Sequence, residues 1–70
     1  MRKKVISIGR DPHGAYVIHF TRWRWFRTED VYVRGSSTVW RYANTGTRCD
    51  VRLEAWLADQ ITLYLWGELS

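Results

Sequence analysis

The hydrophobic period of this 70-residue chain changes once, at Asp50. Before it, apolar and polar residues alternate as in half-buried strands; after it, apolar residues recur every three or four positions, as on one helix face. Strands followed by a helix predict an α+β fold. We expect a single domain over residues 1–70, in which a small antiparallel sheet of three to four strands (a meander within residues 4–43) carries one C-terminal helix, about residues 51–66, on one face.

The predicted sheet begins with a hairpin. Residues 5–8 and 15–20 have strand signatures, and alternation in the second strand places three residues on one side: Tyr16, Ile18 and Phe20. The Asp-Pro-His-Gly sequence at residues 11–14 fits a type I turn between them. Two shorter strands are predicted at residues 31–34 and 38–42.

The predicted helix has an apolar stripe and a polar outer face. The stripe consists of Leu53, Trp56, Leu57, Ile61, Tyr64 and Leu65, and the outer face of Arg52, Ala55, Ala58, Asp59, Thr62 and Trp66. Asp50 is a good N-cap, with Thr47 and Asp50 as an alternative capping pair, and Gly67 is a plausible stop. The Trp66 ring either folds back over a fraying last turn or provides a second contact point or a dimer seam.

Residues 21–27, Thr-Arg-Trp-Arg-Trp-Phe-Arg, break the alternation. If the strand continued unchanged, Arg22 and Arg24 would follow Phe20 onto the buried side, and burying two unpaired guanidinium groups is costly. We therefore expect a bulge or a turn near residues 21–24 that reverses the parity of the strand. It would send Trp23 or Trp25 inward and the arginines outward.

Cysteine content and hydropathy indicate the compartment. A lone cysteine, Cys49, cannot form an internal disulfide, whereas a secreted domain of this size usually needs several. This favours a reducing cytoplasm, that of a bacterium or of a virus-infected bacterial host. The apolar run at residues 5–8 is too short for a signal peptide, and no run approaches the roughly 20 residues of a membrane span.

Charge is distributed unevenly between the two parts of the chain. Ten of the eleven Lys and Arg residues lie before Cys49, together with only three of the seven Asp and Glu residues. The sheet region is therefore strongly basic and the helix region acidic. Exposed bases of this density raise the rate of association with an acidic partner.

A single helix can cover only one face of the sheet, so the other face must meet solvent or a partner. We predict that this face is basic and contains one or two tryptophans. The candidate contact residues are Arg22, Trp23, Arg24, Trp25 and Arg27, with Arg34 and Arg41 attracting the partner. In the alternative interpretation, the rings form the core and the arginine stems pack over them.

No catalytic, metal or cofactor site is predicted. Cys49 lies near the helix start, where the helix dipole would lower its pKa, but no base stands at a readable spacing. His13 and His19 with Cys49 lack the paired spacing of a zinc site. Glu29 and Asp30 are adjacent, so in an extended chain they point apart; we expect a loop there, or local pairing with Arg27.

The layout of the whole chain, with a small meander, one helix, dense Arg and Trp and a segment such as Trp40-Arg41-Tyr42-Ala43-Asn44-Thr45-Gly46-Thr47-Arg48, resembles small accessory proteins of tailed bacteriophages. The resemblance implies a monomer or homodimer that inhibits or modulates a host nucleic-acid-handling enzyme, such as RNA polymerase or a CRISPR effector. Known members are often acidic DNA mimics. This chain is basic, so we expect it to seek an acidic protein surface or a protein–nucleic acid complex, with direct DNA or RNA binding as the alternative.

Overall fold

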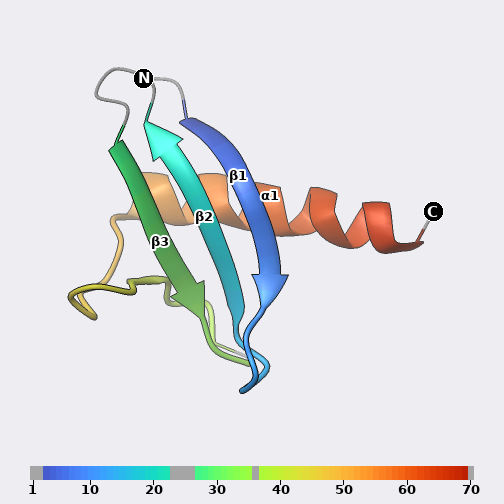
Figure 1. The fold of residues 1–70 in the computed structure, drawn as a ribbon, viewed down its shortest axis with the longest axis horizontal. Coiled ribbons are helices and arrows are strands. Elements are labelled where there is room, and N and C mark those ends of the chain that lie inside the picture. Colours follow the sequence, from blue (N-terminus) through green and yellow to red (C-terminus); the bar gives the residue numbers. More distant parts are fainter. Residues whose placement is uncertain (1–2, 23–26, 36, 70) are drawn as a thin grey trace.

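A computed structural model describes residues 3–22, 27–35 and 37–69 of the chain. Four strands, β1 (Lys3–Arg10), β2 (Tyr16–Arg22), β3 (Arg27–Val33) and β4 (Arg41–Tyr42), precede one helix, α1 (Val51–Leu69). The strands pair in the order β1-β2-β3-β4, each antiparallel to the next. The helix packs against one face of this sheet (Figure 1), so the predicted α+β meander with a C-terminal helix is confirmed.

The β1–β2 hairpin closes through the predicted turn. The Gly14 N–H donates to the Asp11 carbonyl over 3.0 Å, and Gly14 has the positive φ of 85° that favours glycine. The Asp11 side chain accepts further bonds from the N–H groups of His13 and Ala15, both at 2.9 Å. A short polar side chain thus fixes the turn from within.

The helix begins where the sequence predicts. Asp50 Oδ1 accepts a 2.7 Å bond from the Leu53 N–H, which makes Asp50 the N-cap. The helix continues through Gly67 to Leu69, so the predicted stop at Gly67 is wrong. Trp66 is 68% exposed, which excludes a ring folded back onto the chain.

The core lies between the sheet and the first half of the helix. Its buried residues are Ile18, Phe20, Val31, Val33, Trp40, Cys49, Leu53 and Leu57, with Trp56 and Tyr16 among the half-buried residues packed against them. The Trp56 and Phe20 rings lie 5.3 Å apart. Every predicted outer residue of the helix is exposed, from Arg52 to Trp66.

Glu54 ties the chain on both sides of β4 to the helix. Its carboxylate accepts bonds from the Trp40 N–H at 2.9 Å and from the Arg48 guanidinium at 3.3 Å. The bond from Trp40 is the main reason that the pKa of Glu54 is lowered, and Arg48 adds to the effect.

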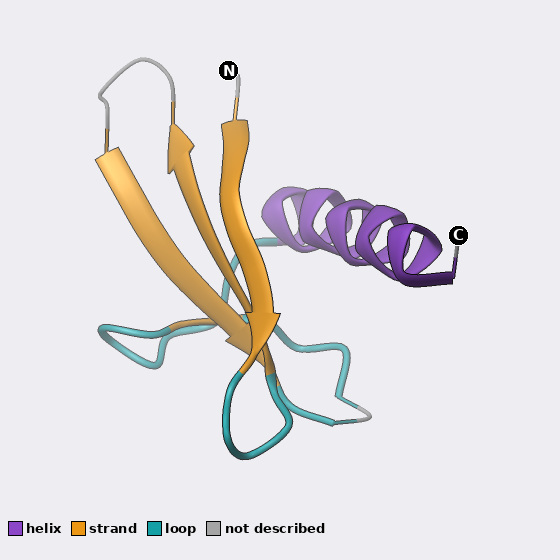
Figure 2. Ribbon diagram, turned by 45° about the vertical axis from the view of Figure 1, so that its right-hand side comes forward, coloured by secondary structure: helices purple, strands orange, loops and turns teal. Residues whose placement is uncertain are grey.

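The helix is longer than the sheet is wide. Figure 1 shows α1 crossing behind the strands, starting behind β3 and ending well past β1, and Figure 2 shows that it lies on one side of the sheet. Leu53 and Leu57 in its first half are buried, whereas Leu63 in its second half is 65% exposed. The second half of the helix thus extends beyond the edge of the sheet that β1 forms.

Three strand predictions need correction. The third strand starts at Arg27, four residues before the predicted start, and the fourth is only two residues long. No parity reversal occurs before Arg22, because β2 and β3 stay in continuous register from Tyr16 to Arg22. The register shift lies instead in β1, between Val5 and Ser7.

The assumption behind the predicted bulge was that an inward Arg22 would be unpaired. Arg22 does lie on the helix-facing side with Phe20, but its Nε donates a 2.8 Å bond to Glu29 Oε2 on β3. A second bond of 3.2 Å runs from its Nη2 to the Tyr42 hydroxyl. A paired guanidinium can stay partly buried, so the strand needs no bulge as far as Arg22. The rest of the predicted bulge or turn, at residues 23 and 24, lies outside the described residues.

Candidate binding surface

The side of the sheet away from α1, which we call the open face, can be defined by register. Directly opposed residues share a face, and Ile18 and Phe20 face the helix, so their neighbours in β2 lie on the open face. These neighbours and their partners are Lys4, Ser7, Gly9, Val17, His19, Thr21, Thr28, Asp30, Tyr32 and Arg41. No element of the described chain covers this face (Figure 2).

A basic and aromatic cluster occupies the β3–β4 side of the open face. Tyr32 on β3 is paired with Arg41 on β4, and the guanidinium carbon of Arg34 lies 5.7 Å from the centre of the Tyr32 ring. These three residues, which we call the Tyr32 cluster, line a depression of about 240 Å³ together with Ser37 and Val39. The Arg41 guanidinium donates a 2.9 Å bond to the Gly46 carbonyl. A phenol ring with one guanidinium beside it and a second arginine on the neighbouring strand can meet both a flat apolar group and an anion.

A hydrogen-bonded pair of side chains lies beside this cluster. His19 Nδ1 and Asp30 Oδ1 share a hydrogen bond across β2 and β3, where the two residues are directly opposed. Among the described residues of the open face there is one acidic side chain, Asp30, and there are three Lys or Arg side chains: Lys4, Arg34 and Arg41. Because Asp30 is engaged by His19, the net character of the face is positive.

The predicted contact residues fall into three groups. Arg34 and Arg41 lie in the Tyr32 cluster, which places them together on the open face. Arg22 lies on the helix-facing side, so its predicted outward orientation is wrong, and Arg27, exposed at the start of β3, is in register with it. Trp23, Arg24 and Trp25 lie outside the described residues.

Arg22 belongs instead to a polar group that closes one end of the helix-facing side. Burial disfavours its charged form, but the hydrogen bond and the charge of Glu29 outweigh this, so the pKa of Arg22 is raised. Burial also raises the pKa of the Tyr42 hydroxyl, as do the nearby Cys49 and Glu29. Arg22 therefore stays charged and the Tyr42 phenol stays neutral beside Glu29, which is a structural arrangement.

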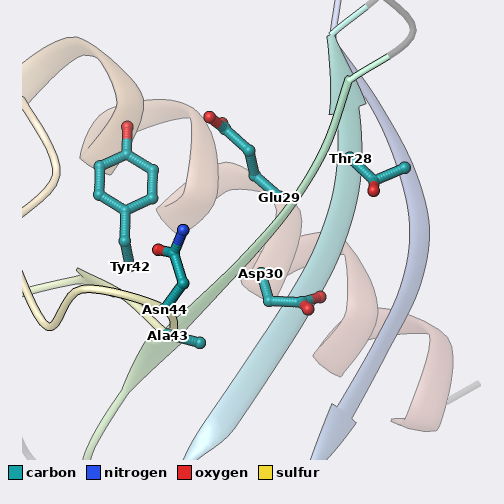
Figure 3. Close-up of a pocket in the computed structure, with 6 residues that line it drawn as sticks. All are labelled: Thr28, Glu29, Asp30, Tyr42, Ala43 and Asn44. Carbon is teal, nitrogen blue, oxygen red and sulfur yellow. The ribbon is translucent and has the colours of Figure 1, made fainter.

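Glu29 and Asp30 do not form an acid–base pair, although both line a cavity of about 150 Å³ beside β4. Figure 3 shows Glu29 reaching toward the side of Tyr42, while Asp30 points away from it. Each carboxylate is already bound, to Arg22 and to His19 respectively. The expected loop at these residues is thus a strand, and the expected pairing with Arg27 is replaced by pairing across β2.

Cys49 is buried, with 3% of its surface exposed. Burial, followed by the charges of Glu54 and Asp50, raises the pKa of its thiol to about 11. The expectation that the helix start lowers this pKa is wrong, because desolvation of the thiolate is the larger effect. At neutral pH the thiol is protonated and packed in the core.

Tyr32 is the central residue of the cluster and was not among the predicted contacts. A signal for it existed: Tyr32 and Arg34 are two positions apart, so alternation puts them on one face if the strand continues. The Arg and Trp residues are denser at residues 21–27, which made that segment the stronger sequence signal.

The described residues contain no group of three His, Cys, Asp or Glu side chains placed to hold a metal ion. Within the same residues, no helix is both long and apolar enough to span a bilayer.

Comparison of the chain with models of protein families, with curated proteins and with solved structures finds no match in any of the three.

Proposed function

We propose that this chain is a non-enzymatic binding protein whose open face docks on an acidic surface of a host nucleic-acid-handling enzyme and inhibits or modulates it. The Tyr32 cluster carries the proposal, because it combines an aromatic ring with two guanidinium groups on an uncovered face. Tyrosine and arginine are among the residues that contribute most to binding at protein interfaces.

The choice of target class rests on the resemblance to small accessory proteins of tailed bacteriophages. Such a protein would act in the cytoplasm of the bacterial host, on RNA polymerase, on a CRISPR effector or on a similar enzyme. The protonated, buried thiol of Cys49 supports a binding role over a catalytic one.

The test is a pull-down from bacterial lysate with the wild-type chain and with Arg34→Ala plus Arg41→Ala. The expected result is one partner that binds the wild type and is lost, by tenfold or so, from the double variant, since two guanidinium contacts are removed. The partner is then identified, and its activity is assayed with and without the purified chain.

The matched control is Arg27→Ala plus Arg52→Ala, which removes the same charge from exposed positions outside the open face. It should keep the partner, with at most a modest loss of association rate. If both double variants lose the partner equally, net charge rather than the open face determines binding, and the proposal is wrong.

Direct nucleic-acid binding is the second candidate, because bases can stack on Tyr32 while phosphates pair with Arg34 and Arg41. Titration of labelled single-stranded and duplex DNA at two salt concentrations separates the candidates. Binding that weakens steeply with salt and depends on Tyr32 supports this second function. Absence of binding at low salt leaves protein recognition.

A further inference from the structure

We propose that the free edge of β1, together with the projecting half of α1, accepts an acidic extended segment of a partner protein as a fifth strand. This site is distinct from the open face and goes beyond the function proposed above. It would add the partner segment beside β1, with main-chain hydrogen bonds on one side and the helix beneath it.

The hydrogen-bonding groups of β1 are arranged for such an addition. Asp30 accepts a bond from Ala43 on the β4 side, so strand alternation directs the main-chain groups of Ile18 toward β3 and those of Val17 and His19 toward β1. In β1, Ser7 and Gly9 therefore face β2. The main-chain groups of Val5 and Ile8 point the other way, where no strand of the described chain lies.

The helix places an exposed apolar side chain, Leu63, at the distance from β2 that a fifth strand would have. Trp56 packs under Phe20 of β2 at 5.3 Å, and Leu63 lies seven residues further along the same side of α1. Seven helical residues span about 10.5 Å, and two strand spacings span about 9.6 Å. Two strands on from β2 is the position just outside β1. By this spacing Leu63, which is 65% exposed, lies where a fifth strand would cover it.

Charge identifies the occupant. β1 contains Lys3, Lys4 and Arg10 and no acid. A second copy adding through its own antiparallel β1 would bring the Lys3 end of one strand opposite the Arg10 end of the other, and opposed like charges destabilise a strand pair. Lysines and a bulge are also common protections against edge-to-edge self-association. An acidic segment with alternating apolar residues would place its acids near the bases of β1 and its apolar side chains on Leu63 of the helix.

The probe is an eight-residue peptide that alternates valine with glutamate, titrated into the isotopically labelled full chain. Strand addition should slow amide hydrogen exchange at Val5 and Ile8, whereas Ser7 and Gly9 already donate toward β2 and should change little. A peptide with lysine in place of glutamate should bind about tenfold more weakly, because several opposed charge pairs become repulsive. A proline at the centre of the acidic peptide should also weaken binding, because it removes a main-chain donor.

Two variants locate the site. Leu63→Ala should weaken binding of the acidic peptide several-fold. Val51→Ala shortens an apolar side chain on the outer side of the helix that is 76% exposed, against 65% for Leu63, and should leave binding unchanged. The Arg34→Ala plus Arg41→Ala variant should bind the peptide like the wild type, so this proposal can fail while the open-face function stands.

Three results would overturn the proposal. One is a slowing of amide hydrogen exchange that is confined to residues of the open face. Another is equal binding of the acidic and basic peptides. The third is concentration-dependent protection of Ile8 without any peptide, which would assign the edge to a second copy of the chain.

Discussion

The two faces of the sheet use opposite means to stabilise the same strands. On the helix-facing side, Ile18, Phe20 and Val31 are fully buried. On the open face, their immediate neighbours are half-buried or exposed and most are polar, as in the hydrogen-bonded pair of His19 with Asp30. Only one side therefore contributes a packed core, and the other is available for recognition.

The hydrogen-bonded pairs of a basic and an acidic side chain on the two faces differ in exposure in the same way. Arg22 and Glu29, on the helix-facing side, have side chains that are 22% and 24% exposed. His19 and Asp30 are 35% and 53% exposed. Because partial desolvation makes a missing partner costly, the first pair should matter for stability and the second for surface chemistry. Four predictions test this contrast, from the largest effect to the smallest.

Phe20→Ala should lower the free energy of unfolding by about 3–5 kcal/mol, because a fully buried ring is replaced by a cavity. Val17→Ala, three residues away on the open face, should cost about 1 kcal/mol or less. Urea unfolding followed by circular dichroism measures both. If Phe20→Ala does not fold, the milder Ile18→Val should still lose about 0.5–1.5 kcal/mol. Equal losses for Phe20→Ala and Val17→Ala would contradict the assignment of the two faces.

Glu29→Gln should lower the free energy of unfolding by about 1–2 kcal/mol, because Arg22 keeps its charge in a partly buried position without a carboxylate. Asp30→Asn changes the adjacent residue in the same way on the open face and should stay within about 0.5 kcal/mol. The same urea midpoints provide the measurement. A larger loss for Asp30→Asn would reverse the roles assigned to the two pairs.

Glu54→Gln should flatten the acid side of the pH–stability curve. The pKa of Glu54 in the folded chain is below its ordinary value of 4.5, so its carboxylate contributes stability above that value and loses the contribution as the pH falls through the folded pKa. Urea unfolding from neutral pH to about pH 2 should show wild type and variant converging at the acid end. Parallel curves would indicate that the bonds from Trp40 and Arg48 do not depend on the charge.

Arg34→Ala should change the free energy of unfolding by no more than about 0.5 kcal/mol, since the residue is exposed beside an uncovered ring. Thermal unfolding would measure this small change. A loss above 1 kcal/mol or so would show that Arg34 is structural, and would remove it from the proposed contact residues.

Local signals predicted much of the fold. The Asp50 cap, the Asp11 turn and the alternation of β2 each depend on residues close in sequence, and the structure confirms all three. The sharp change of period before Val51 was enough to place the start of the helix.

The wrong predictions depend on partners that are distant in sequence. Acidic residues are disfavoured in strands, so Glu29 and Asp30 suggested a loop. Each is accommodated in β3 because the β2 register places Arg22 or His19 within reach. The same pairing keeps Arg22 facing inward. No local rule could reveal that Arg22 and Glu29 meet, because only the register of β2 with β3 brings them together.

The buried thiol of Cys49 can be used to measure how readily the core between helix and sheet opens. Cys49 belongs to the same buried core as Trp40 and Leu53, and its N–H donates a 2.8 Å bond to the Trp40 carbonyl, just before the helix cap. An alkylating reagent can reach the sulfur only when the core around Cys49 opens. The rate of alkylation therefore measures this local opening, and no cysteine has to be introduced. Mass spectrometry of the chain at successive times would give the alkylation rate, and with it the extent to which helix and sheet separate at neutral pH.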